Sequence, residues 1–108
     1  MENKFLESTF LKREKRHART YLIEADVYAF LVNASIKYQA SISDIVNACL
    51  AKFIKSGTIK GNTHIYAAAP TRNLTITESN IVGLKKLKRE THLTFTSLIN
   101  MAVRAIMD

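Results

Sequence analysis

The residue types most often used in catalysis and metal binding are sparse in this sequence. Its histidines, His17, His64 and His92, have no cysteine or carboxylate at ligand spacing, so no metal site is expected. The sequence contains no glycine-rich phosphate loop, no nucleophile elbow and no paired acid and base. Carboxylates such as Asp26 and Glu78 lie where helices are expected to begin, and there they interact with the helix dipole. The sequence therefore predicts a protein that is not an enzyme and needs no cofactor.

Positive charge is in clear excess. Sixteen Lys and Arg residues against nine Asp and Glu residues give a formal net charge of +7 in 108 residues. A surplus of this size in so short a chain favours a polyanionic partner. No apolar run of about 18 residues is present, so we expect no membrane span. Because the N-terminal residues lack the apolar core of a secretory signal, we expect a cytoplasmic protein.

The chain contains an internal repeat. A shift of 53 positions places residues 18–55 over residues 71–108 without a gap. Few positions are identical: Arg19 and Arg72, Ile23 and Ile76, Leu31 and Leu84, and Asn47 and Asn100. The apolar pattern agrees better, because six positions at the spacing of one buried helical stripe are apolar in both copies: Ile45, Val46, Cys49, Leu50, Phe53 and Ile54, and Leu98, Ile99, Ala102, Val103, Ile106 and Met107. A duplicated unit is the simplest explanation.

This repeat divides the chain into an N-terminal basic arm or short helix (residues 1–17), a first unit (18–55), a linker (56–70) and a second unit (71–108), with both units in one domain. Each unit opens with a short alternating segment, at residues 20–24 and 73–77, which predicts a strand. A helix with a buried stripe follows, formed by Val27, Phe30, Leu31, Ala34 and Tyr38 in the first unit and by Ile81, Leu84 and Leu87 in the second.

A second helix closes each unit. Ser41 with Asp44 three residues later predicts a capping box in the first unit, and Thr94 is a simpler cap in the second. The first of these helices is expected to end at Gly57, which suits a left-handed C-cap. Cys49 lies within the apolar stripe and is interpreted as a small core residue. In the linker, the pair Gly61-Asn62 is compatible with a hairpin turn.

The order of strand, helix, Ser-x-Ser-acid cap and second apolar helix resembles the MetJ/Arc ribbon–helix–helix superfamily. The segment Leu74-Thr75-Ile76-Thr77-Glu78-Ser79 resembles the strand of a CopG-type repressor, and Ser41-Ile42-Ser43-Asp44-Ile45-Val46 resembles the start of the family's second helix. The resemblance implies a mainly α fold with a two-stranded antiparallel β-ribbon, in which one chain forms a duplicated ribbon–helix–helix pseudo-dimer, as in TraY-type tandem proteins. It further implies that this ribbon binds double-stranded DNA in the major groove.

The resemblance also assigns the two faces of the ribbon. Tyr21 and Ile23 of the first strand, with Leu74 and Ile76 of the second, correspond to the inner face. The side chains expected to contact bases are then Ala18, Thr20, Leu22, Thr71, Asn73 and Thr75, and an asparagine can pair with adenine. Leu22 departs from the polar residue usual in the family. Either it contacts a thymine methyl group, or the first strand has the other phase, with Arg19 and Tyr21 outward.

Contacts with the DNA backbone are expected at the second-helix N-termini, where free N–H groups meet phosphates. The residues assigned to this role are Ser41, Ser43, Thr94 and Thr96, and the basic run before the first strand adds Lys15 and Arg16. Such contacts position a protein without reading sequence. Residues 1–11 remain as a segment for a protein partner.

Several functions agree with this reading. A transcriptional repressor or regulator of a plasmid or mobile-element operon is the family's commonest role, and a relaxosome accessory protein at a conjugative transfer origin is favoured by the tandem arrangement. An antitoxin is a third role, but the second unit runs to Asp108, so we expect no C-terminal tail for a toxin. An α-helical interaction module that binds no DNA would require both strand predictions to be wrong. We expect a monomer that assembles further mainly on DNA.

Overall fold

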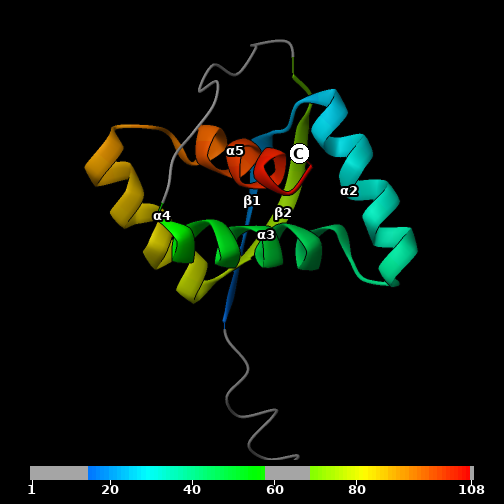
Figure 1. Ribbon diagram of the computed structural model, residues 1–108, viewed down its shortest axis with the longest axis horizontal. Helices are drawn as coiled ribbons and strands as arrows, with labels where there is room; N and C mark the ends of the chain where they lie inside the picture. Colours follow the sequence, from blue (N-terminus) through cyan, green and yellow to red (C-terminus); the bar gives the residue numbers. More distant parts are fainter. Residues whose placement is uncertain (1–14, 58–68, 108) are drawn as a thin grey trace, which may run out of the picture.

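The computed structural model describes residues 15–57 and 69–107. These residues form two strands and four helices (Figure 1), in the order β1 (Arg16–Leu22), α2 (Ala25–Tyr38), α3 (Ile42–Ser56), β2 (Thr71–Thr77), α4 (Glu78–Thr91) and α5 (Phe95–Met107). The protein is thus mainly helical with a two-stranded antiparallel sheet, as the sequence predicted. The turn pair Gly61-Asn62, His64 and residues 1–11 lie outside the described residues.

The two strands pair antiparallel although nearly fifty residues separate them in the chain. Arg16 is opposite Thr77 at one end and Leu22 is opposite Thr71 at the other. Backbone hydrogen bonds extend the pairing at both ends, from Ile23 to Pro70 and from Glu78 to Lys15, each at 2.9 Å. We call this pair of strands the ribbon.

Both strands begin earlier than the sequence pattern predicted. The first was expected at residues 20–24, but β1 starts at Arg16, so Arg16 and His17 belong to the ribbon and not to an N-terminal arm. Alternation of apolar residues is absent over this basic stretch, and the strand forms there because β2 offers it a complete edge for pairing. Pairing with a distant partner overrides local preference in strands.

Local signals account for both ends of α3 and for the start of α5. Ser41 and Asp44 form the predicted capping box at the start of α3, and Gly57 ends that helix in the left-handed conformation at φ 65°. At the start of α5 the Thr94 hydroxyl accepts the Ser97 N–H at 3.1 Å. Helix α4 ends at His92, which adopts φ 62° without being glycine.

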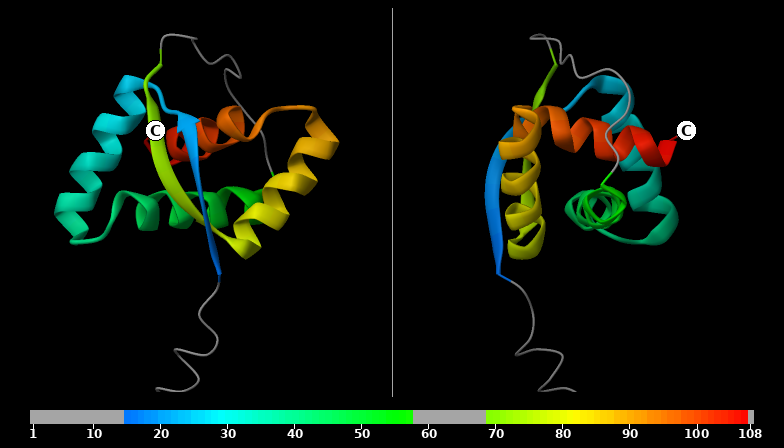
Figure 2. Two further views of the ribbon diagram at one scale, coloured as in Figure 1. Left: turned by 180° about the vertical axis from the view of Figure 1, so that it is seen from behind. Right: turned by 60° about the vertical axis from the view of Figure 1, so that its left-hand side comes forward.

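All four helices pack below one face of the ribbon, and no described helix covers the opposite face, as the back and side views show (Figure 2). We call this opposite face the uncovered face. A single hydrophobic core fills the space between the ribbon and the helices. Its fully buried side chains come from both halves of the chain, and they include Ile23, Leu31, Val46, Leu50, Ile76, Leu84, Leu98, Ile99 and Val103.

The predicted apolar stripes form most of this core. Val27, Leu31 and Ala34 of α2 are buried, as are Ile81, Leu84 and Leu87 of α4, and Cys49 is buried as expected. Two assignments were wrong: Tyr38 is 65% exposed and Ile106 is 37% exposed. Both lie in the last turns of their helices.

Candidate nucleic-acid interface

The uncovered face of the ribbon presents three cross-strand pairs besides that of Arg16 with Thr77. Cross-strand neighbours project from the same face of a sheet, and successive residues alternate between faces. Thr20 is opposite Asn73, Ala18 is opposite Thr75, and Leu22 is opposite Thr71. The side chains of Ala18, Thr20, Thr71 and Asn73 are exposed, and those of Leu22 and Thr75 are half-buried. This face therefore offers hydroxyl and amide groups to solvent.

The other face of the ribbon belongs to the core. Tyr21 is 6% exposed, Leu74 is 2% exposed, and Ile23 and Ile76 are fully buried. The alternative phase of the first strand, with Tyr21 pointing outward, is therefore wrong. Arg19 has the same parity as Tyr21 and so leaves the strand on the helix side, although its long side chain reaches solvent.

The N-terminus of α3 lies beside the outer edge of β2. The Ser43 hydroxyl accepts the backbone N–H of Thr75 at 3.0 Å. A hydroxyl that accepts one N–H still has a proton to donate to an anion. Ser41 accepts the Asp44 N–H at 3.0 Å, so its hydroxyl oxygen serves the helix cap. The Ser43 side chain is thus hydrogen-bonded to the ribbon, and Ser41 begins the helix that carries it.

The N-terminus of α5 is the counterpart on the other side of the ribbon. Thr94 is exposed and caps the helix, donating its hydroxyl proton to Ser97 Oγ at 3.1 Å. Thr96 is half-buried in the first turn, where backbone N–H groups lack intrahelical partners. Both threonines belong to the same helix start, and the positive end of the helix dipole lies there.

The basic residues at the start of β1 have different surroundings. The guanidinium of Arg16 lies 2.9 Å from the carboxylate of Asp44, and it holds the pKa of that carboxyl below its ordinary value. This ion pair ties the end of the ribbon to α3, and it neutralises part of the charge of Arg16. Lys15 is exposed, and its carbonyl oxygen accepts the N–H of Glu78.

The asparagine that is identical in the two repeats, Asn47 in the first and Asn100 in the second, has a role that the sequence pattern did not predict. Asn47 is 7% exposed and fastens α3 to the edge of β2. Its Nδ2 donates to the carbonyl oxygens of Ser43 and Thr75, both at 2.8 Å. Its Oδ1 accepts the N–H of Thr77 at 2.9 Å. A polar side chain inside an apolar stripe satisfies strand groups that would otherwise be buried without partners.

Asn100 does the same for α5 and β1. Its Nδ2 donates to the carbonyl oxygens of Thr96 at 2.8 Å and Leu22 at 2.9 Å, and its Oδ1 accepts the N–H of Glu24 at 3.1 Å. Each of these partners lies 53 residues from the corresponding partner of Asn47. Among the identities that relate the two repeats, the pair of asparagines was the signal that could have revealed this contact.

The remaining chemistry-bearing side chains make structural contacts. His17 lies 2.7 Å from the carboxylate of Glu78, which lowers the pKa of that carboxyl. Residues 15–57 and 69–107 contain no group of three histidine, cysteine or acidic side chains placed to hold a metal ion. Over the same residues, none of the helices is both long enough and apolar enough to span a bilayer.

Comparison of the chain with protein-family models, with curated proteins and with solved structures produced no match.

Proposed function

We propose that this protein binds double-stranded DNA sequence-specifically by inserting the uncovered face of its ribbon into the major groove. The observation that carries the proposal is the exposed polar face formed by Thr20, Asn73 and their neighbours, on the side of the ribbon opposite the helices. A two-stranded ribbon fits the major groove, where amide and hydroxyl side chains can read base edges. The net charge of +7 suits the polyanionic partner.

We further propose that the chain is a duplicated ribbon–helix–helix unit that acts as a pseudo-dimer. Thr20 and Asn73 are related by the 53-residue shift and are also paired opposite each other, as expected for residues on a pseudo-two-fold axis. The repeated hydrogen bonds of Asn47 and Asn100 support the same relation. With this symmetry, a single chain would supply both strands of a DNA-reading ribbon.

Backbone contacts complete the proposal. Ser41 and Ser43 on one side of the ribbon, with Thr94 and Thr96 on the other, would bind phosphates that flank the groove. Lys15 and Arg16 would add contacts at the end of the ribbon. These residues would set the orientation of the protein on the duplex, while the ribbon side chains would set the sequence.

We favour the role of a repressor or other transcriptional regulator. A small protein whose ribbon carries short side chains suits binding to one operator. The pseudo-symmetry within one chain also favours the second candidate, an accessory protein at a conjugative transfer origin, since a single chain whose two halves differ can read an asymmetric site.

The test begins with selection of a preferred duplex from a random library, followed by titration of variants. Asn73→Ala and Thr20→Ala are expected to weaken binding of the selected duplex by about 1–3 kcal/mol each, because each removes a base contact. Binding of random duplex should change little. The free energy of unfolding, followed by thermal melting, should change by about 0.5 kcal/mol or less, because both side chains are exposed.

Leu74→Ala is the matched control, since it lies between outward residues of the same strand and is buried. It is expected to destabilise the fold by roughly 2–5 kcal/mol, because it empties a core site. Selection that enriches no sequence would contradict the proposal, as would unchanged duplex affinity of the Asn73→Ala variant.

A further inference from the structure

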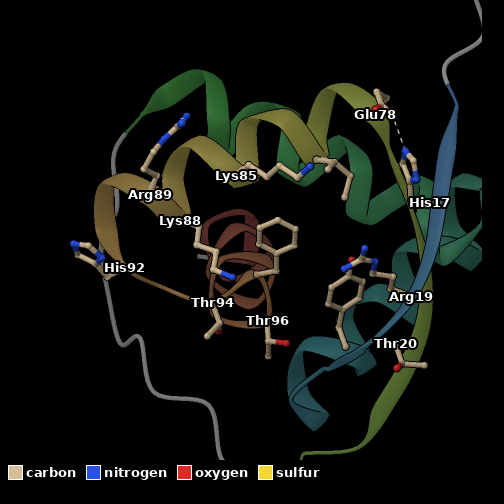
Figure 3. Close-up of a pocket in the computed structure, with 13 residues that line it drawn as sticks. His17, Arg19, Thr20, Glu78, Lys85, Lys88, Arg89, His92, Thr94 and Thr96 are labelled. Carbon is tan, nitrogen blue, oxygen red and sulfur yellow. Dashed lines mark hydrogen bonds and ion pairs between the residues drawn. The ribbon is translucent and has the colours of Figure 1, made fainter.

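A cavity of about 900 Å³ opens between β1, α4 and the start of α5 (Figure 3). Its size lies within the range of small-molecule sites, roughly 300–1,000 Å³. Its lining is strongly basic, since five cationic or potentially cationic side chains besides His17 contribute to it: Arg19, Lys85, Lys88, Arg89 and His92. Thr94 and Thr96 bring the positive end of the α5 dipole to the same cavity.

Negative charge does little to offset this lining. Of the described residues that line the cavity, Glu78 is the one acid, and its carboxylate is already 2.7 Å from His17. In Figure 3 this pair lies at one end of the cavity, away from Lys88, Thr94 and Thr96. The rest of the lining is therefore an uncompensated cluster of donors and positive charges.

One residue of the lining, Tyr21, has a buried hydroxyl without a partner among the described residues. The residue as a whole is 6% exposed. A buried hydroxyl without a partner is costly and is seldom left so. Phe95 adds an aromatic ring to the lining, with the ammonium group of Lys88 5.5 Å from its centroid. A ligand with a planar body would match the Phe95 ring.

The other half of the chain provides an internal comparison. At the positions 53 residues earlier, the basic side chains of α4 and its C-cap are replaced by uncharged ones: Val32 for Lys85, Ser35 for Lys88, Ile36 for Arg89 and Gln39 for His92. There the guanidinium of Arg72, the counterpart of Arg19, packs 3.8 Å from the centroid of the Tyr28 ring. In the second half Ile81 replaces Tyr28. The basic cavity is thus specific to one half.

We propose that this cavity binds a phosphate ester carried on a nucleoside-sized group, with Arg19, Lys85 and Lys88 holding the phosphate beside the first turn of α5. Two sources have this chemistry, a free nucleotide and a nucleotide unit of a DNA strand. If the ligand is a free nucleotide, the cavity is a site separate from the DNA-binding face. If the ligand is a nucleotide unit of a DNA strand, the inference rests on the proposed function.

The first arm uses ATP as the probe and the full-length protein. ATP is expected to shift the backbone amide resonances of residues that line the cavity, and calorimetry gives its affinity. Lys85→Gln combined with Lys88→Gln should weaken ATP binding about tenfold or more, because two charge-assisted hydrogen bonds are lost. Lys52→Gln combined with Lys86→Gln removes the same charge from exposed positions outside the cavity lining, and it should change the affinity by less than about twofold.

The second arm titrates the selected duplex into the same variants. If the cavity holds a phosphate of the DNA strand, the Lys85 and Lys88 changes weaken duplex binding and ATP competes with the duplex. If it holds a free nucleotide, duplex affinity is retained and only ATP binding is lost. ATP and duplex binding that are both insensitive to these two lysines, or equally sensitive to the control pair, would overturn the proposal. Failure of the ribbon proposal is separate, because it is read from Asn73→Ala.

Discussion

At the scale of single residues, Asn47 and Asn100 have the largest expected effect on stability for polar side chains. Asn100 is 1% exposed, and it satisfies two carbonyl groups and one N–H on two different elements. Asn100→Ala removes the hydrogen-bond partners of the Leu22 carbonyl group and the Glu24 N–H, and each buried polar group left without a partner costs roughly 1–3 kcal/mol. We therefore expect chemical denaturation to show that Asn100→Ala lowers the free energy of unfolding by roughly 1–3 kcal/mol or more. Asn33→Ala, at an exposed position of α2, is the control and should be nearly neutral.

Arg104 should make the free energy of unfolding depend on pH in the acid range. Its guanidinium donates to Glu24 and to Asp26, at 2.8 Å each for the shortest contacts. The hydrogen bond from Arg104 is the main reason that the pKa of Asp26 lies below its ordinary value. A lowered folded-state pKa contributes stability above the unfolded-state pKa, and that contribution is lost as pH falls through the folded-state pKa.

The measurement is denaturant unfolding of the parent and of Arg104→Gln between pH 7 and pH 2. The variant should be less stable by about 1 kcal/mol near neutral pH, since Asp26 is largely exposed and its pair is screened. The difference should shrink below about pH 4, where aspartate begins to protonate. A difference that is constant down to pH 2 would mean that the arginine contributes by packing and not by charge.

At the scale of elements, α4 packs closely against α3 at Gly83. A Cβ placed on Gly83 would lie 2.7 Å from Cδ1 and 2.8 Å from Cγ2 of Ile54. A β-branched side chain has little freedom to move away. Glycine is therefore required here for close approach, although alanine would otherwise favour the helix by about 1 kcal/mol.

We expect Gly83→Ala to lower stability by roughly 1–3 kcal/mol through overpacking. In an Ile54→Ala background the same change should be neutral or stabilising, because the atoms that it meets are gone. Thermal melting of the four proteins in this double-mutant cycle measures the coupling. Additive effects would show that α4 and α3 separate easily at this position.

At the scale of the whole molecule, one core serves both halves of the chain. Its buried residues come from every described strand and helix, and each strand pairs with the other strand of the same chain. Neither half can close its strand edge or bury its helices without the other. We therefore expect the chain to fold as one cooperative monomer.

Light scattering at micromolar concentration should give a mass near 12.2 kDa, and the melting temperature should not change on dilution. Calorimetric unfolding should show a single transition. A melting temperature that falls on dilution would contradict the monomer and would favour exchange of strands between chains.

Features governed by neighbours in the sequence could be predicted without the structure. The capping box at Ser41, the end of α3 at Gly57 and the buried faces of α2 and α4 depend on residues within one or two helical turns. The phase of β2 was also correct, because Leu74 and Ile76 alternate with polar residues. Repetition of these local patterns at 53 residues predicted the order of elements.

Features that join distant residues were decided only by the tertiary structure. Strand β1 begins at Arg16 because Thr77 is opposite it, and nothing in the basic segment itself marks that start. The contacts of Asn100 with Leu22 and Glu24 cross nearly eighty residues of sequence. The basic cavity likewise combines β1 with α4 and α5. Local periodicity encodes which face of an element is apolar, whereas packing determines which elements meet, and both the asparagine contacts and the cavity arise where they meet.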